Sequence, residues 1–124
     1  GTLTAKTTCV WLGNHLFFLT EARTDQQRQK GLMHQTSLGL DAGLLFIYDR
    51  AVYVPIWMRN TVLPLDIIWL DRNYRVVDLY LSAVPFDETV LMPKQKAKYV
   101  IEVWAGTVKR TGLKINDIVI PLER

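Results

Sequence analysis

The stretch Trp57-Met58-Arg59-Asn60-Thr61-Val62-Leu63-Pro64-Leu65-Asp66 places a guanidinium, a carboxamide, a hydroxyl and a carboxylate close together in the sequence. Apolar segments flank it on both sides, at 52–56 and at 67–70. Polar groups between buried strands need partners, because an unpaired one costs about 1 to 3 kcal/mol. The stretch is therefore either a hydrogen-bonded crossing between strands or a binding site, and the sequence leaves both open.

Strand-forming segments surround this stretch. An opening hairpin is predicted over 4–21, with its turn at Gly13-Asn14. Alternating or continuous apolar runs predict further strands, with turns at 49–50 and at Asn73 and a closing strand after a second turn near 116–117; these strands cover 44–48, 51–57, 65–70, 74–82, 98–104 and part of 113–122. The segment 83–97 contains two prolines and no sustained period, so we expect a long surface loop.

Two short helices complete the prediction. Thr24 is a suitable N-cap, Gln27 completes a capping box, and Gly31 stands where a left-handed C-cap belongs. A second helix is predicted between Ala105 and Gly112. The fold class is therefore mainly β (β-rich α+β), a single antiparallel β-sandwich or partly open barrel of about eight short strands with two short helices.

Composition favours one domain over residues 1–124, with 49% hydrophobic and 22% charged residues. The net charge is +3, but most basic residues are interleaved with acids, so we expect an ordinary solvated surface and no nucleic-acid partner. The lysines at 94, 96 and 98 support the alternative hypothesis that the protein binds nucleic acid. Binding of nucleic acid through them would weaken steeply with added salt.

The sequence offers no metal or cofactor motif. Cys9 is the only cysteine, and His15 and His34 lack a carboxylate or cysteine at ligand spacing, so we predict no metal and no cofactor. The longest mostly apolar stretches, 51–58 and 62–70, are far shorter than the roughly 18 residues that span a bilayer. We therefore expect no membrane span. Because the chain begins at Gly1 rather than Met, we expect a processed or truncated protein, so any signal peptide would be invisible in this sequence.

Three blocks of this sequence resemble the signature blocks of the DUF192 family of bacteria and archaea. They are Arg28 to Met33 with Asp41 to Phe46, Trp57 to Thr61 with Pro64 to Ile67, and Tyr99 to Val103 with Ala105 to Thr107 and Gly112 to Lys114. The resemblance implies a β-rich single domain, often exported behind a signal peptide or lipoprotein leader, and hence a periplasmic or otherwise exported location. It implies no known reaction.

The sequence departs from the family pattern at four places. Arg59 stands where Lys is usual, Trp104 where Pro is usual, and Asn116 where Gly is usual. The loop after Ser82 lacks the cysteine pair that some members carry, which removes any disulfide across that loop.

The central stretch supplies the first candidate ligand-binding residues, Trp57, Arg59 and Asn60. Arg59 and Asn60 would present hydrogen-bond donors, and Trp57 would present a flat apolar platform. This combination suits a small polar or anionic ligand, such as a carboxylate, a sugar or a peptide end.

Asp66 and Glu102 complete the candidate site. Asp66 follows Pro64 at the start of an apolar strand, where it either accepts bonds from backbone amides or pairs with Arg59. Glu102 shares its strand face with Val100 and Trp104, so it is either exposed or partly buried beside the central stretch.

The leading functional prediction is a non-catalytic ligand-binding or accessory domain of the bacterial cell envelope, as a monomer or weak dimer, with the loop from Val84 to Lys96 as a lid. The alternative is a hydrolase that uses Asp66 with Glu102 or Asp41 as acid and base. That chemistry requires two carboxyl groups about 5 to 10 Å apart. Standard catalytic motifs are absent from the sequence, so whether the protein is an enzyme stays open.

Overall fold

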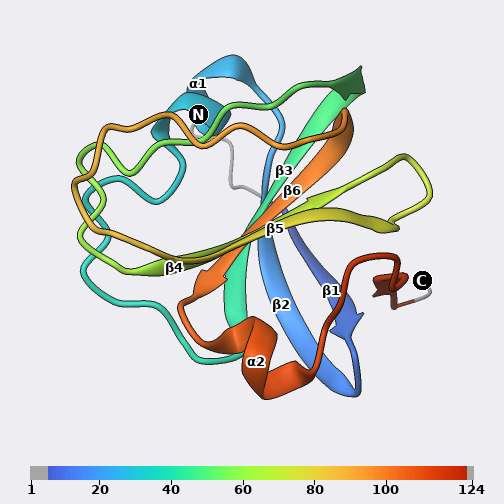
Figure 1. Ribbon diagram of the computed structural model, residues 1–124. Helices are drawn as coiled ribbons and strands as arrows, with labels where there is room; N and C mark the ends of the chain where they lie inside the picture. The colour runs from blue at the N-terminus through green and yellow to red at the C-terminus, as the bar shows by residue number, and fades with distance from the viewer. Residues whose placement is uncertain (1–5, 123–124) are drawn as a thin grey trace.

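The computed structural model describes residues 6–122, which form one curled sheet with two short helices (Figure 1). The sheet order is β5-β4-β6-β3-β2-β1-β7. The strands are β1 (Thr7–Leu12), β2 (His15–Ala22), β3 (Ala42–Val52), β4 (Leu65–Leu70), β5 (Val76–Ala83), β6 (Ala97–Trp104) and β7 (Ile120–Pro121), and the helices are α1 (Asp25–Lys30) and α2 (Thr107–Thr111). The mainly β prediction and its partly open barrel are confirmed, with seven strands in the described residues where about eight were expected.

One pair in the sheet is parallel, whereas the predicted sheet was antiparallel throughout. β2 and β3 run in the same direction, and the other named pairs are antiparallel. A parallel pair needs a long crossover between its strands. Here α1 and the segment up to residue 41 provide that crossover, which brings the end of α1 over the sheet.

The segment 116–121 links the two ends of the sheet. On one side, the amide of Val76 donates to the carbonyl of Asp117 at 2.8 Å, and the amide of Val119 donates to the carbonyl of Tyr74 at 2.9 Å. On the other side, β7 pairs with β1. This segment therefore bridges the two ends of the curled, half-barrel sheet around an interior core.

Strands β4 and β6 and the first half of β3 are buried on both faces. The interior core lies inside the curl and consists of Val10, Leu12, Phe17, Leu19, Leu45, Ile68, Leu70, Val76, Tyr99, Ile101, Val103, Val108, Leu113 and Val119. A second core covers the outer face and includes Leu32, Leu44, Phe46, Val54, Ile56, Met58, Leu63, Leu65, Ile67, Trp69, Val77 and Val100. All six residues of β4 are buried, so a polar side chain on this strand lies away from bulk water on either face.

Two long segments without regular secondary structure, 53–64 and 84–96, run side by side over this outer core (Figure 1). Ile56 and Leu91 exchange both backbone hydrogen bonds, at 2.9 and 2.7 Å. The amide of Met58 also donates to the carbonyl of Asp87 at 2.9 Å. Through these bonds, the loop 84–96 holds the segment that carries Trp57 against the molecule.

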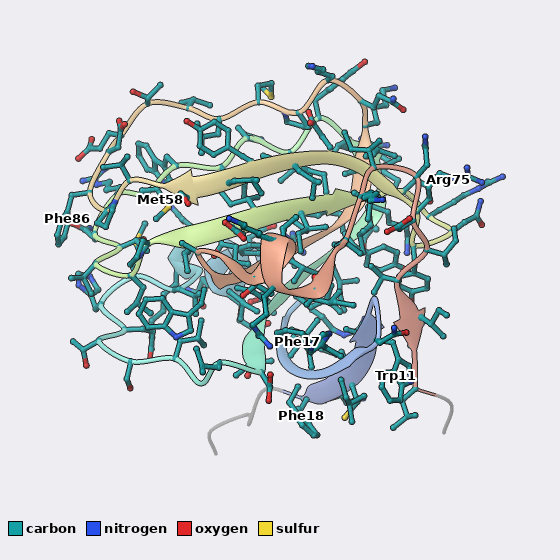
Figure 2. The ribbon with its side chains drawn as sticks, turned by 60° about the horizontal axis from the view of Figure 1, so that its bottom comes forward. Trp11, Phe17, Phe18, Met58, Arg75 and Phe86 are labelled. Carbon is teal, nitrogen blue, oxygen red and sulfur yellow. The ribbon has the colours of Figure 1, made fainter. Side chains whose placement is uncertain are left out.

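Local signals predicted the first hairpin and helix well. The alternation of β2 buries Phe17 completely and leaves Phe18 half exposed on the outside of the hairpin (Figure 2). The capping box of α1 is present, with the Gln27 amide donating to Thr24 Oγ1 at 3.1 Å. Gly31 caps the helix with φ 51° and ψ −129°, so its φ is positive as expected although its ψ lies outside the left-handed helical region. Residues 4 and 5 of the predicted hairpin lie outside the described residues.

Two local predictions were wrong. No turn occurs at 49–50, because β3 continues to Val52 through a register shift against β6 after Ile47. The following segment is therefore not a strand of the sheet, and its Ile56 only bridges to Leu91. The predicted turn at Asn73, in contrast, does join β4 to β5, and within it Tyr74 adopts a positive φ of 63°.

Candidate functional site

The carboxylate of Asp66 anchors three separate parts of the backbone. Its Oδ1 accepts a hydrogen bond from the amide of Ser82 at 2.9 Å. Its Oδ2 accepts from the amides of Gly106 at 3.1 Å and Val108 at 2.9 Å. Of the two partners that the sequence allowed, backbone amides are the ones that the structure provides. Asp66 is 1% exposed and ties the start of β4 to the end of β5 and the start of α2.

Asp66 and Glu102 lie on neighbouring strands but on opposite faces of the sheet. Asp66 pairs with Val103, and Ile67 pairs with Glu102. Because successive residues of a strand point to opposite faces, Asp66 faces the interior and Glu102 faces the outer core. The third carboxylate of the hydrolase hypothesis, Asp41, is exposed, and its Oδ1 is 3.6 Å from Nη2 of Arg110. The structure thus does not bring Asp66 into one acid–base site with Glu102.

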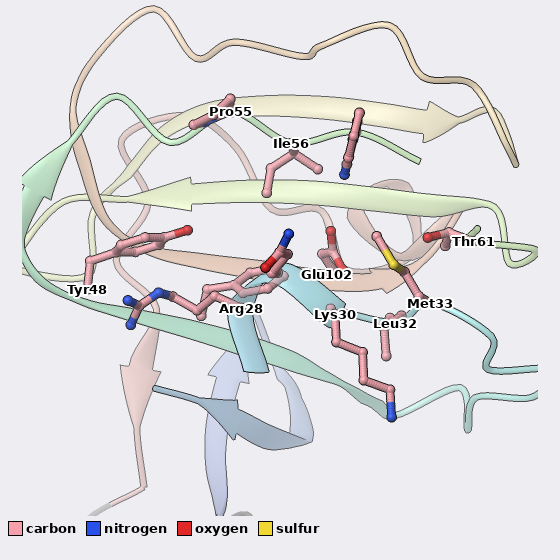
Figure 3. Close-up of a pocket in the computed structure, with 13 residues that line it drawn as sticks. Arg28, Lys30, Leu32, Met33, Tyr48, Pro55, Ile56, Thr61 and Glu102 are labelled. Carbon is pink, nitrogen blue, oxygen red and sulfur yellow. The ribbon is translucent and has the colours of Figure 1, made fainter. Parts of the chain in front are cut away.

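Glu102 instead lines a pocket of about 200 Å³ on the outer face of the sheet (Figure 3). The end of α1, strand β3, strand β6 and the segment 55–61 form its walls. Its apolar lining is Gly31, Leu32, Met33, Phe46, Pro55, Ile56 and Trp57, and its polar lining is Arg28, Gln29, Lys30, Tyr48, Thr61 and Glu102.

The Glu102 side chain is buried in this pocket without a partner in residues 6–122. The residue is 4% exposed, and neither a hydrogen bond nor an ion pair to its carboxyl group is found in this part of the chain. Burial raises the pKa of Glu102 to about 8, so the carboxyl group is mostly protonated at pH 7 and can donate a hydrogen bond. A Cβ at Gly31 would lie 3.7 Å from Glu102 Oε1, which places this end of α1 in contact with the carboxyl group.

Tyr48 and Arg28 form a second polar group on the wall of the pocket. The Arg28 guanidinium lies 4.6 Å from the centroid of the Tyr48 ring. It also donates to the carbonyls of Arg23 and Ile47 and, at 2.6 Å, to Oδ1 of Asp25. Burial raises the pKa of Tyr48, and the Arg28 charge partly offsets that effect. Tyr48 is therefore a neutral phenol at pH 7, and Figure 3 shows its hydroxyl directed into the pocket.

Trp57, Arg59 and Asn60 meet in a second hollow of about 420 Å³. The Arg59 guanidinium lies 5.3 Å from the Trp57 ring centroid, as expected for a cation over an aromatic face. Asn60 has a positive φ of 53°, and its carbonyl accepts a hydrogen bond from the His34 amide at 2.9 Å. Trp57 lines both hollows, so it is the residue that connects them.

The family assignment rests on nearly the whole chain. The DUF192 family model, described as "Uncharacterized ACR", matches residues 9–120. This chain belongs to the DUF192 family. No curated protein matches the sequence of this DUF192 domain.

Two solved structures share its fold and part of its sequence. A protein from Sinorhizobium meliloti 1021, named as a "putative transcription regulator", has a TM-score of 0.92 and 29% sequence identity, and the match covers 98% of each chain. A protein of unknown function from Novosphingobium aromaticivorans has a TM-score of 0.84 and 38% identity over 91% of this chain and 81% of its own. Neither name identifies a ligand or a reaction.

The structure divides the predicted site of this DUF192 domain. It brings Trp57 together with Arg59 and Asn60 in one hollow and with Glu102 in the other, and it places Asp66 outside both. Sequence reasoning missed Arg28, Tyr48 and Gly31. The available signal was Tyr48 at the polar end of an otherwise apolar run, two residues after Phe46 and hence on the same strand face.

The described part of the chain contains no cluster of side chains that could bind a metal ion. No group of three or more His, Cys, Asp or Glu residues within 6–122 is placed to hold a metal ion. The same residues include no helix long and apolar enough to cross a membrane.

Proposed function

We propose that this DUF192 domain binds a small polar molecule in the pocket beside Glu102, as a binding or accessory domain rather than as an enzyme. The observation that carries the proposal is the Glu102 carboxyl group, which is buried on the pocket wall without a hydrogen bond from residues 6–122. The carboxyl group lines the pocket, and residues 6–122 make no hydrogen bond to it. A ligand in the pocket with a suitable donor or acceptor would supply that partner.

The dimensions and lining of the pocket limit the ligand to a small molecule. Its volume of about 200 Å³ is below the roughly 300 to 1,000 Å³ of pockets that hold drug-sized compounds. Rings and aliphatic side chains would cover the body of the ligand, and Glu102, Tyr48 and Thr61 would orient its polar end. An anionic substituent on the same ligand would reach the outer hollow, where Lys30 and Arg59 supply positive charge.

Catalysis by paired carboxylates receives less support than binding. Glu102 is the only Asp or Glu among the residues that line the pocket, while Asp66 accepts three backbone hydrogen bonds on the other face of the sheet. Two carboxyl groups at a shared reacting atom are what a general acid and base of this kind require.

We further propose that the domain works in the bacterial cell envelope, as the resemblance to exported members of the family implies. Fractionation of cells that express the full-length native gene should place the protein in the periplasm or another exported fraction. Recovery of all of it from the cytoplasm would contradict this proposal without affecting the pocket.

Small-molecule binding should depend on Trp57. In a screen of small polar compounds followed by amide chemical shifts, we expect the shifts caused by binders to cluster at 28–33, 46–48 and 56–61, the segments around the pocket. Trp57→Ala should weaken these binders by about tenfold, because an aromatic contact typically contributes about 0.5 to 1.5 kcal/mol beyond its buried area.

Trp11→Ala is the matched control, because Trp11 and Trp57 are each 37% exposed but Trp11 lies on β1, outside the pocket. Its affinity for the same compounds should equal that of the parent. Binders whose shifts lie elsewhere, or whose affinity is the same in both variants, would contradict the proposed site.

A further inference from the structure

The buried Glu102 carboxyl group has no cationic counterpart within residues 6–122. Two cationic side chains line the pocket, Arg28 and Lys30. The Arg28 guanidinium is used by Asp25 and by two backbone carbonyls. Figure 3 shows the Lys30 ammonium directed away from Glu102 and out of the pocket. No ion pair is found between Glu102 and either residue.

Aromatic rings line the same small volume. Phe46, Tyr48 and Trp57 all contribute to the pocket wall. The face of an aromatic ring attracts a cation, and this attraction strengthens when the cation is removed from water. An anion would gain nothing from these faces. Arg28 already lies over the Tyr48 ring and Arg59 over the Trp57 ring, whereas no cation of residues 6–122 lies over Phe46. A positively charged group on a ligand would therefore have Glu102 and the Phe46 ring as its partners.

We propose that this pocket binds an organic ammonium ion, whose charged nitrogen lies against Glu102 and whose hydrocarbon body lies against Leu32, Met33 and Ile56. The proposal rests on the proposed function and names the class of its ligand. A protonated amine has the donors that a carboxylate requires and the charge that the rings favour.

Binding of such an ion is coupled to loss of a proton. Because burial holds the pKa of Glu102 at about 8, the free protein carries a neutral carboxyl group at pH 7. The incoming ammonium favours the carboxylate, so the carboxyl proton passes to the solvent and an ion pair remains in the pocket. The charge balances, since one cation is bound and one proton is released. A neutral alcohol of the same shape would release no proton.

The experiment compares benzylamine with benzyl alcohol by calorimetric titration at pH 7, each in two buffers of different ionisation enthalpy. We expect benzylamine to bind about tenfold more tightly than benzyl alcohol, a difference of about 1.4 kcal/mol. The dependence of the benzylamine heat on the buffer should correspond to nearly one released proton for each bound amine. Benzyl alcohol should show no such dependence.

Glu102→Gln keeps the shape of the side chain and removes the acid. It should lower the affinity for benzylamine by about tenfold and abolish the proton release. The affinity for benzyl alcohol should stay unchanged. Glu88→Gln, on the exposed part of the loop 84–96, is the control and should behave like the parent. The other ionisable groups that line the pocket, Arg28, Lys30 and Tyr48, remain present in both variants, so they cannot account for a difference between them.

Equal affinity for the amine and the alcohol, or amine binding without proton release by the parent protein, would overturn the ammonium proposal and leave the pocket as a site for neutral ligands. If neither these probes nor any compound of the polar screen shifts the pocket resonances, both the ammonium proposal and the proposed function fail. Because the proton count is measured on the parent protein, this test does not depend on the folding of any variant.

Discussion

Replacing Asp66 by asparagine is expected to lower the free energy of unfolding by about 3 to 5 kcal/mol, measured by urea denaturation at pH 7. The Asp66 carboxylate accepts three hydrogen bonds from backbone amides at the end of β5 and the start of α2. Hydrogen bonds to a charged group contribute about 1.5 to 3 kcal/mol each. The asparagine side chain would keep one acceptor oxygen, but its NH₂ group would face a backbone amide that is itself a donor.

Arg59→Gln provides the control for this measurement within the same sequence stretch. Arg59 is exposed, and its guanidinium contacts the ring of Trp57. Loss of an exposed contact of this kind should cost no more than about 1 kcal/mol. If both variants lost little stability, Asp66 would not be the anchor that its hydrogen bonds indicate. A loss of several kcal/mol in Arg59→Gln would instead assign a structural role to Arg59.

Glu102→Gln is expected to change the free energy of unfolding differently at different pH. The variant should gain several kcal/mol over the parent at pH 8, compared with the difference between the two proteins at pH 4.5. Burial raises the pKa of Glu102 from 4.5 to about 8 on folding. Between these values the folded chain holds a proton that the unfolded chain has lost. The free energy of unfolding therefore falls as pH rises, by about 1.4 kcal/mol for each pH unit. The stability contribution is fully present below pH 4.5 and is lost by about pH 8.

Between pH 4.5 and pH 8, the free energy of unfolding of the parent should fall by about 3 to 5 kcal/mol. The Glu102→Gln variant should not lose this stability, because glutamine does not ionise. Urea denaturation of the parent and of Glu102→Gln at pH 4.5 and pH 8 measures the difference. Glu88→Gln, at an exposed position, should stay within about 0.5 kcal/mol of the parent at both pH values. A Glu102→Gln difference that does not change with pH would show that the carboxyl group is not shielded from water. If the stability difference between Glu102→Gln and the parent rises with pH, Glu102 lowers the stability of the fold at neutral pH. Residues of binding sites often have this effect.

Features of the fold that depend on neighbouring residues were predictable from the sequence. Gly13-Asn14 marks the first turn, and Thr24 with Gln27 marks the start of α1, because each of these signals acts within a few residues. The turn predicted at 49–50 does not form, because pairing with β6 keeps the chain extended as far as Val52. The parallel pairing of β2 and β3 has no local signal of its own.

The candidate site was predictable only in part for the same reason. Trp57, Arg59 and Asn60 are neighbours in sequence, and they meet in one hollow. Whether Asp66 and Glu102 share a face depends on the register between β4 and β6, which the sequence of either strand does not contain. The burial of Glu102 depends on covering segments that have no periodic pattern, at 31–33 and 55–61. Tyr48 and Arg28 enter the pocket through the same long-range packing.

Segment 116–121 bonds to both ends of the sheet, and it is synthesised after both of its partners. The order of synthesis therefore limits the order in which the sheet can fold. Those partners, β1 and the residues around Val76, are made much earlier than the segment itself. Until it is made, the growing chain can curl but the two ends of the sheet cannot be bridged, and the apolar residues of the interior core stay accessible to water and to other chains. Bridging of the two ends of the sheet is therefore a late event that depends on contacts distant in sequence.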